Sequence, residues 1–286
     1  MKKIKSPGTL PANAIKPNLT EELREKIELY RDKLWRRTES GKITTPPEAE
    51  QLIGELGFCY TLTDFRKKMP SLFIAVCGRR DVYSPKNPQK DPESSLAWLL
   101  KDEIIRRGNV YYAKLVKGHA TFISREMIPI FNSLWGCSRA GESGVLTKEA
   151  RIILDILRKE WEMATADLLA ESGIRKKADF DKIMEELQRR MKVIATEVVY
   201  EPKFTYIWTA SETRFSNELK SKLPRDEAMY LLAKRYLQTF AYEQSGELAK
   251  RFRLTASEAN SAFLRLAKEG FAVKLDNGDY LLQSLL

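Results

Sequence analysis

The clearest alternation of apolar and polar positions lies near the end of the chain. Four apolar side chains there recur at the spacing of one helical face, namely Ala259, Ala262, Phe263 and Leu266. Thr255 and Glu258 have capping-box spacing at the start of this segment, and Gly270 ends it. Two helical segments precede it, and alternating strands follow around Asn277-Gly278, a strong hairpin signal. This order of three helices and a hairpin predicts a winged helix over residues 217–286.

The same order of elements occurs once more, immediately upstream. Its first predicted helix carries a single apolar face, formed by Ala150, Ile153, Leu154 and Leu157. A short helix ending at Gly173 follows, then a third helix over 176–191 and a hairpin over 193–211. We therefore expect a second winged helix over residues 144–216, about 75 residues from the first, as an internal repeat of architecture.

The N-terminal half is less regular but contains the same kinds of element. A polar, proline-containing stretch is expected to form a flexible basic tail over residues 1–18. Helices are predicted in four segments of this half, over 19–37, 45–57, 95–108 and 125–136. A hairpin is expected to turn at Lys117-Gly118. We interpret residues 19–143 as an elaborated N-terminal winged-helix unit. The predicted fold is mainly α with small β-hairpins (α+β), in three tandem winged-helix (helix-turn-helix) units.

Composition narrows the class of partner. The 286 residues contain 49 Lys and Arg but 39 Asp and Glu, a formal net charge of +10 that favours a polyanion. No stretch of about 18 apolar residues is present to span a membrane. We therefore expect a cytoplasmic, nucleoid-associated monomer that binds double-stranded DNA and no membrane. One histidine and three widely spaced cysteines form no recognisable metal-ligand pattern, so neither a metal nor another cofactor is predicted.

Two predicted helices differ in what they present to a DNA groove. The outward positions of the last helix carry small or donor-rich side chains: Ser257, Asn260, Ser261 and Arg265. Three basic residues lie just upstream, Lys250, Arg251 and Arg253. Such side chains suit contacts with phosphates and base edges, and the alternative is a solvated amphipathic face. The matching helix of the middle unit is acidic, with Asp179, Asp181, Glu185 and Glu186. Because these acids repel phosphates, we expect the middle unit to pack between its neighbours.

A short helical stretch and the single histidine are the candidates for chemistry. Asp102 and Glu103 are adjacent carboxylates behind Lys101, and carboxylates can activate a water or stabilise a cationic transition state. His119 stands at the start of a predicted strand. An exposed charged turn and a structural histidine are the corresponding simpler interpretations. Three nearby aromatic residues could stack a base, although core packing is expected for at least two of them: Trp98, Tyr111 and Tyr112.

Three segments together resemble one known family: LIGELGFCYTLTDF, WLLKDEII and YYAKLVKGHATFIS. They are similar to the AlkZ-like winged-helix DNA glycosylases, especially their AlkZ-related branch, and the resemblance spans residues 45–286. The family carries a stretch of the type LGxVQxQ or LGxVQxD whose polar pair contributes to catalysis. Here Tyr60 stands at the first Gln and Leu62 at the second polar position, and a leucine cannot orient or deprotonate a water. Asp64, two residues on, is a candidate substitute, and His119 matches the His-Ala core of a second family stretch, WxHxASLLP.

The resemblance implies hydrolysis of the N-glycosidic bond of an alkylated purine in DNA. That reaction develops oxocarbenium character on the sugar, which a carboxylate and an oriented water stabilise. The implied electrostatic and water-positioning groups are Asp102, Glu103 and Asp64, with Tyr60 and His119 as polar wall residues. The residues then expected to hold phosphates are Lys101 and Lys114.

Two other function classes stay open on the residues alone. A non-catalytic winged-helix DNA-binding protein, such as a transcription regulator or a damage sensor, fits the missing polar pair. A protein-interaction scaffold fits the acidic helix of the middle unit but leaves the net charge of +10 unexplained. Salt-sensitive duplex binding excludes the scaffold, and release of a free base separates an enzyme from a sensor.

Overall fold

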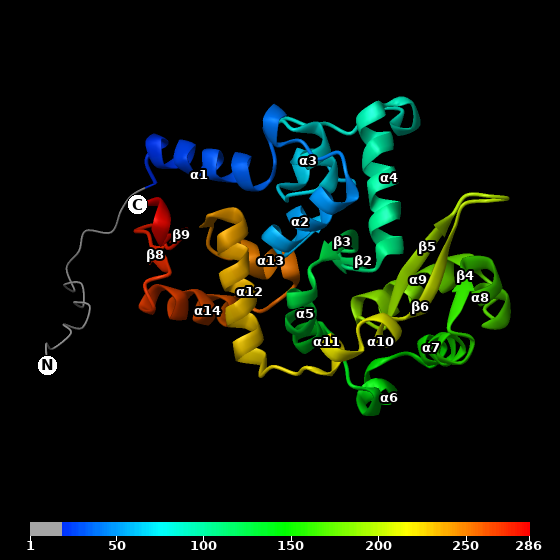
Figure 1. The fold of residues 1–286 in the computed structure, drawn as a ribbon. Coiled ribbons are helices and arrows are strands. Elements are labelled where there is room, and N and C mark those ends of the chain that lie inside the picture. Colours follow the sequence, from blue (N-terminus) through cyan, green and yellow to red (C-terminus); the bar gives the residue numbers. More distant parts are fainter. Residues whose placement is uncertain (1–18) are drawn as a thin grey trace, which may run out of the picture.

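Helices surround three small antiparallel sheets in this chain (Figure 1). The structure is a computed structural model that describes residues 19–286, and the predicted tail over 1–18 lies outside the described residues. Each sheet has three strands, and its last strand in chain order lies in the middle: β1-β3-β2, β4-β6-β5 and β7-β9-β8. The α+β class predicted from the sequence is therefore confirmed.

The first sheet and the helices around it come from the N-terminal half. The helices are α1 (Glu21–Leu34), α2 (Pro46–Leu56), α3 (Leu72–Cys77), α4 (Pro92–Arg107) and α5 (Ile128–Trp135). The strands are β1 (Phe58–Tyr60), β2 (Tyr111–Val116) and β3 (His119–Ile123). Short 3-10 turns join them: η1 (Glu39–Gly41), η2 (Phe65–Lys67), η3 (Pro88–Lys90) and η4 (Arg125–Met127).

Local signals set the boundaries of these elements. Thr45 and Glu48 form the predicted capping box at the start of α2. The β2–β3 hairpin turns at Lys117 and Gly118 as predicted, with φ of 51° and 73°. Positive φ at both central residues is the mark of a type I′ turn, whose twist matches that of the strands. This turn places the single histidine at the first position of β3.

The middle and C-terminal units supply the other two sheets. The middle elements are α6 (Glu142–Val145), α7 (Lys148–Glu160), β4 (Glu162–Ala164), α8 (Thr165–Glu171), α9 (Lys177–Arg189), β5 (Val193–Val199) and β6 (Thr205–Ala210). Turn η5 (Arg139–Gly141) precedes them, and α10 (Ser211–Arg214) and α11 (Ser216–Lys220) follow. The C-terminal elements are α12 (Arg225–Phe240), β7 (Tyr242–Glu243), α13 (Glu247–Phe252), α14 (Ala256–Lys268), β8 (Ala272–Lys274), β9 (Tyr280–Leu282) and η6 (Gln283–Leu285). The predicted capping box of α14 and the hairpin around Asn277-Gly278 are both present.

One aromatic core joins the two ends of the chain. The fully buried ring of Phe58, on β1, lies 6.2 Å from that of Phe131 and 5.3 Å from that of Phe252. These partners come from α5 and α13, so a strand of the N-terminal half packs directly on a helix of the C-terminal unit.

Helix α1 also contacts the C-terminal unit, as Figure 1 shows by its place beside β8 and β9. Its side chains donate three hydrogen bonds to the last turn of α12. Trp35 Nε1 reaches the carbonyl of Thr239 at 2.7 Å, and Arg31 Nε reaches that of Phe240 at 2.8 Å. The Tyr30 hydroxyl contacts the carbonyl of Gln238 at 2.7 Å. Within the predicted segment 19–143, α1 is thus clasped to the other end of the chain.

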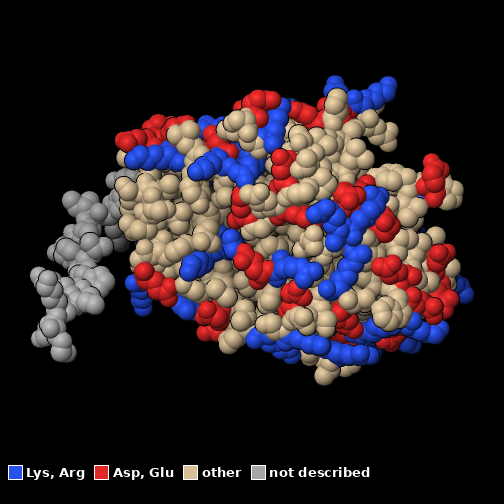
Figure 2. Space-filling view, viewed as in Figure 1, with Lys and Arg blue, Asp and Glu red and all other residues tan. Residues whose placement is uncertain are grey.

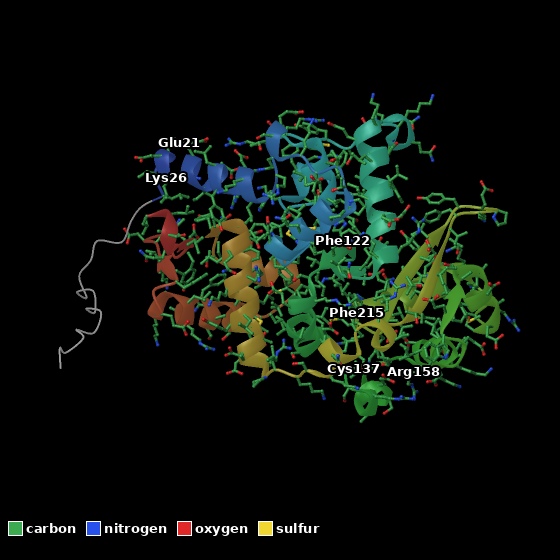
Figure 3. The ribbon with its side chains drawn as sticks, in the orientation of Figure 1. Glu21, Lys26, Phe122, Cys137, Arg158 and Phe215 are labelled. Atoms are coloured by element: carbon green, nitrogen blue, oxygen red, sulfur yellow. The ribbon has the colours of Figure 1, made fainter. Side chains whose placement is uncertain are left out.

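The acidic helix of the middle unit packs against the first hairpin, as expected for a structural element. Gln188, on α9, accepts a hydrogen bond from the backbone N–H of Lys114 on β2 at 3.0 Å. A buried ion-pair network closes the lower edge of this unit. Arg158 contacts Glu142 at 2.7 Å and Glu212 at 2.8 Å, and Figure 3 shows it beside Cys137 near α6 and α7.

Candidate nucleic-acid interface

The residues predicted to share one site lie on opposite faces of the first sheet. Strand pairing sets Tyr60 beside Thr121, whereas Tyr112 stands opposite Phe122. Because successive residues of a strand point to opposite faces, Tyr60 and Tyr112 are on different sides. The ring of His119 packs against that of Tyr60, with centroids 5.0 Å apart, so it lies on the Tyr60 side.

The Lys101 and Asp102 pair is buried on the Tyr112 side. Each is only 1% exposed, and Lys101 Nζ lies 2.6 Å from Asp102 Oδ1. Lys101 also donates to the Tyr206 hydroxyl at 3.2 Å, and Tyr200 donates to the Asp102 carboxylate. The Tyr206 hydroxyl in turn contacts that of Tyr112 at 3.3 Å. At this burial a phosphate cannot reach Lys101 and bulk water cannot reach Asp102. The predicted phosphate-binding role of Lys101 and the predicted water-positioning role of Asp102 therefore do not fit the structure. The pair instead joins α4 to the β5–β6 hairpin.

The other predicted groups of this region divide between surface and core. Glu103 is on the surface of α4, where its carboxylate lies 3.4 Å from Arg106. Tyr111 and Tyr112 belong to the core, as expected for at least two of the three aromatic candidates. Trp98 keeps 36% of its surface exposed, with the Lys101 ammonium 4.3 Å from its ring.

The carboxylate of Asp64 is ionised, and neighbouring groups donate hydrogen bonds to it. Its carboxylate caps η2 and accepts hydrogen bonds from the Arg66 guanidinium, with Nε 3.0 Å from Oδ2, and from the Ser84 backbone N–H at 3.2 Å. The Arg66 hydrogen bonds lower the pKa of Asp64 to about 2. A carboxylate held this way is a poor general base, because abstracting a proton would cost it the guanidinium contact.

Tyr60 is buried and His119 is half-buried, on the same face of the first sheet. Burial raises the pKa of Tyr60 to about 12, and the nearby charge of Arg251 opposes that rise. Burial, followed by the charges of Lys67 and Lys117, lowers the pKa of His119. The histidine is therefore a neutral imidazole at pH 7, able to accept a proton. Leu62 is half-buried and offers no polar atom on its side chain.

A basic pocket lies near these two residues, and three of its lining residues, Lys67, Lys117 and Arg251, are the cations whose charges act on them. It is a cavity of about 670 Å³ between α1, the η2 loop, the β2–β3 turn and α12–α13. Its nine cationic side chains are Arg31, Arg37, Arg66, Arg80, Arg251, Lys67, Lys68, Lys117 and Lys250. Its three carboxylates are Glu28, Asp81 and Glu247. The excess of cations concentrates a positive potential in a concave site, which favours an anionic ligand.

Three lysines of the basic pocket carry unpaired charge. On the face drawn in Figure 2, basic and acidic side chains are interspersed. Within residues 19–286, Lys67, Lys68 and Lys117 have no carboxylate within ion-pair distance. Lys68 and Lys117 also have φ of 49° and 51°, the left-handed region that favours glycine.

Three arginines of the pocket lie over aromatic rings. The guanidiniums of Arg31 and Arg37 lie 5.6 and 4.9 Å from the ring of Trp35, and that of Arg251 lies 5.4 Å from Phe240. Arg251 also donates to the backbone carbonyl of Lys67 at 3.3 Å. A guanidinium over a ring is attracted by the negative face of the ring, which restricts the positions of its side chain.

The basic surface continues from the pocket to the middle unit. A smaller cavity of about 100 Å³ has three cations at its lining, Lys117, Arg189 and Arg253, from the β2–β3 turn, α9 and the end of α13. Its other lining residues are apolar: Leu115, Val116, Phe131, Trp135 and Phe252. We call the basic pocket and this cavity together the basic band. All three units of the chain contribute cations to it.

Comparison with known proteins places the chain in a family. A profile of the AlkZ-related family matches residues 43–253, about three quarters of the sequence. The chain belongs to the AlkZ-related family. The fold agrees with a solved structure, the DNA glycosylase AlkZ of Streptomyces sahachiroi, at a TM-score of 0.59 and 12% identity. That alignment covers 91% of this chain and 70% of AlkZ. A search of curated proteins finds no significant match.

Two absences accompany this assignment. Among residues 19–286, no helix is long and apolar enough to cross a membrane. The same residues contain no group of three or more His, Cys, Asp or Glu side chains positioned to hold a metal ion.

The predicted DNA contacts of the C-terminal unit fall in two places. Lys250 and Arg251 line the basic pocket, and Arg253 lines the adjoining cavity. The α14 residues Ser257, Asn260 and Ser261 are exposed, beyond the segment that matches the family.

Arg265 is less available than its position on α14 predicts. It is 2.6 Å from Glu227, 3.1 Å from Glu269 and stacked 3.7 Å from the ring of Tyr230. Lys114, on β2, is exposed, as a phosphate contact requires.

Sequence reasoning missed Glu243, a buried carboxyl behind the basic pocket. It is 1% exposed, accepts the Leu248 backbone N–H at 2.8 Å, and has no partner for Oε2 among the described residues. Burial raises its pKa from 4.5 to about 7. Because the folded carboxyl keeps its proton up to about pH 7 and the unfolded one loses it near 4.5, stability is lost as pH rises between these values. No local pattern signals this group, because its burial depends on α12 and α13 together.

We expect the Glu243→Gln variant to keep its unfolding free energy as the pH rises, because its side chain does not titrate. Between pH 5 and pH 8 the wild type should lose about 2 kcal/mol more unfolding free energy than the variant, measured by urea denaturation. Glu162→Gln, at an exposed carboxylate of the middle unit, serves as the control and should keep the wild-type dependence. Parallel pH profiles for the wild type and Glu243→Gln would show that the buried carboxyl does not titrate in this range.

Proposed function

We propose that this protein binds duplex DNA through the basic band and removes alkylated purine bases from it. The observation that carries the proposal is the gathering of cations from all three units in the basic band, with the unpaired Lys67 and Lys117 close to His119. Each unpaired lysine placed on a phosphate releases a condensed counterion, which drives binding. The family assignment and the shared fold with a DNA glycosylase support the repair chemistry.

We also propose that the three units are winged helices with the boundaries 19–143, 144–216 and 217–286. The shared strand order supports this, because in each unit a short first strand pairs with a later hairpin. In such units a helix or the hairpin can approach the groove. We propose a monomer that works on DNA at the nucleoid in the cytoplasm.

The proposed reaction places modest demands on the protein. A purine alkylated at N7 already carries positive charge, so it leaves with the electrons of the broken C1′–N9 bond and needs no added proton. A water molecule then forms the new bond to C1′, and its proton passes to a general base of the protein. His119 is the group proposed to accept it, with Tyr60 as a polar wall, because Asp64 and Asp102 are both engaged.

A non-catalytic damage sensor is the second candidate, and one observation favours it. Leu62 occupies the second polar position of the family motif, and the nearest carboxylate, Asp64, is tied to Arg66. A protein with this site could hold a damaged duplex without cleaving the glycosidic bond.

Release of free base from duplex DNA carrying N7-methylguanine separates the two candidates. Mass spectrometry should detect N7-methylguanine above the spontaneous rate, and His119→Gln should lower the enzymatic rate by about 100-fold. A binding titration on the same duplex accompanies the assay. Salt-dependent binding without release would establish the sensor, and no binding to this duplex would reject both candidates.

A further inference from the structure

A second cavity lies where segments of all three units meet. Its volume of about 680 Å³ falls within the range of small-molecule sites, roughly 300–1,000 Å³. Its walls come from α5, the segment 136–139, Lys192 before β5, α10, α11 and the segment that leads to α12. We call this cavity the junction pocket.

The junction pocket is separate from the basic band. Ser133 of α5 lines the junction pocket, whereas Phe131 and Trp135 of the same helix line the smaller cavity of the band. Because each residue advances about 100° around a helix, Ser133 points away from the side that carries the other two. Helix α5 therefore stands between the two cavities.

Cations of the junction pocket are free, whereas its carboxylate is engaged. Among residues 19–286, Glu212 is the only carboxylate that lines the cavity, and it accepts hydrogen bonds from Arg158 at 2.8 and 3.3 Å. Arg139, Lys220 and Lys222 also line the cavity and are exposed. Within the same residues none of these three has a carboxylate within ion-pair distance. The junction pocket therefore carries uncompensated positive charge.

A buried ammonium adds donors that lack acceptors. The Lys192 side chain lines the cavity, is only 8% exposed, and has Nζ 2.7 Å from Glu142 Oε1. Glu142 is its only hydrogen-bond partner in the described part of the chain, so two of its three N–H groups are unused. A buried donor without an acceptor costs free energy, which an anion in the cavity would recover.

Two hydroxyl groups have the same polarity. Ser133 Oγ accepts the backbone N–H of Leu223 at 3.0 Å, and Ser138 Oγ accepts that of Gly141 at 3.2 Å. Since each oxygen accepts in these bonds, its own O–H is left to donate. Donors that outnumber acceptors match the oxygens of a phosphate group.

We propose that the junction pocket binds a small molecule that carries a phosphate group. The pocket's cations bind the phosphate, and the half-buried side chains of Leu219 and Leu223 contact the rest of the molecule. A backbone phosphate of DNA presents the same group, so the test has to separate these two sources. The inference does not depend on the proposed function.

Alkylation of Cys137 reports whether the junction pocket is occupied. This half-buried thiol lines the cavity (Figure 3), whereas the other two cysteines of the chain, Cys59 and Cys77, are buried. Burial raises the pKa of the Cys137 thiol, so its reaction with iodoacetamide is followed at about pH 9. Glycerol 3-phosphate, at ten times the Kd found by calorimetry, should slow alkylation about tenfold. Glycerol, and sodium chloride at equal ionic strength, should leave the rate unchanged.

Two charge-matched variants locate the site. Lys220→Gln with Lys222→Gln should weaken binding of glycerol 3-phosphate about tenfold, because two charged donors to the phosphate are lost. Both lysines are exposed, so the fold should be kept. Lys67→Gln with Lys117→Gln removes the same charge from the basic pocket and should leave Kd within about twofold, since salt screens distant charges.

Three results would overturn the proposal. The first is no heat of binding with glycerol 3-phosphate. The second is binding that leaves Cys137 alkylation unchanged or that is lost only in the Lys67 and Lys117 variant, since either places the ligand outside the junction pocket. The third is protection by a short paired duplex but not by glycerol 3-phosphate at equal phosphate concentration, which would assign the site to DNA. Protection by glycerol 3-phosphate would stand even for a protein that neither binds a duplex nor releases a base.

Discussion

Replacing Lys67, Lys68 and Lys117 together by glutamine should weaken duplex DNA binding on the order of 100-fold at 0.1 M salt. These three side chains line the basic pocket and have no carboxylate partner among the described residues, so their full charge is free to displace counterions. Each phosphate contact contributes about 0.9 to the slope of log affinity against log salt concentration. The slope should therefore fall by about 2.7 in the triple variant. Fluorescence anisotropy with a labelled duplex at four salt concentrations measures both quantities.

A matched variant removes the same amount of charge elsewhere. Lys159, Lys177 and Lys182 are exposed lysines of the middle unit, and each lies near a carboxylate, within 3.6 Å at most. Their replacement by glutamine should leave the salt slope within about 0.5 of the wild-type value. If both triple variants lose affinity equally, net charge alone drives binding and the basic band has no special part in it.

Removing the charge of Lys101 should destabilise the protein by about 3–5 kcal/mol. Lys101→Met leaves the Asp102 carboxylate in a site where only 1% of that residue is exposed, facing the hydroxyl of Tyr200 but no cation. An uncompensated buried charge is the costly state, whereas a buried pair often contributes little on its own. Urea denaturation at pH 7 measures the loss of unfolding free energy.

The double variant Lys101→Met, Asp102→Leu should recover most of that stability, because neither charge is left buried. It also decides whether this pair has any part in chemistry. We expect its duplex affinity and rate of base release to match the wild type, since the pair lies on the far side of the first sheet from Tyr60. A folded double variant that binds DNA but releases no base would restore Asp102 to the reaction.

Much of the fold was predictable because its signals are local. The capping boxes at Thr45 and Thr255 and the turn at Lys117-Gly118 are short patterns whose geometry depends on adjacent residues. Strand β1 and helix α3 were missed for the opposite reason. Every residue of Leu72–Cys77 is buried, so that segment shows no alternation that could reveal its period. The strands that begin the other two sheets, β4 and β7, were also missed, since they are only three and two residues long.

The candidate site was only partly predictable, because distant segments assemble it. Lys101 reads as a surface residue of a charged turn, yet Tyr206, more than 100 residues away, covers it. The pocket collects cations from α1, η2, the β2–β3 turn and α13, and no periodic pattern links these segments. Lys250, Arg251 and His119 were found because each stands beside a recognisable element. The lysines of the η2 loop lie in a stretch without such a signal.

The hydrogen bonds between α1 and α12 bear on which molecule changes shape when the protein binds its proposed DNA ligand. Trp35 and Arg31 tie the first helix to the last turn of α12, and both residues also line the basic pocket. The receptor is therefore assembled before any ligand arrives, and little ordering entropy remains to be lost by the protein on association. In the proposed complex, the free energy of deformation is therefore paid mainly by the DNA, which bends or unstacks to contact the preformed protein surface. We therefore expect the protein to prefer DNA sites that deform easily, such as pyrimidine–purine steps or weakened base pairs. This preference depends on the deformability of the duplex and not on contacts with particular bases.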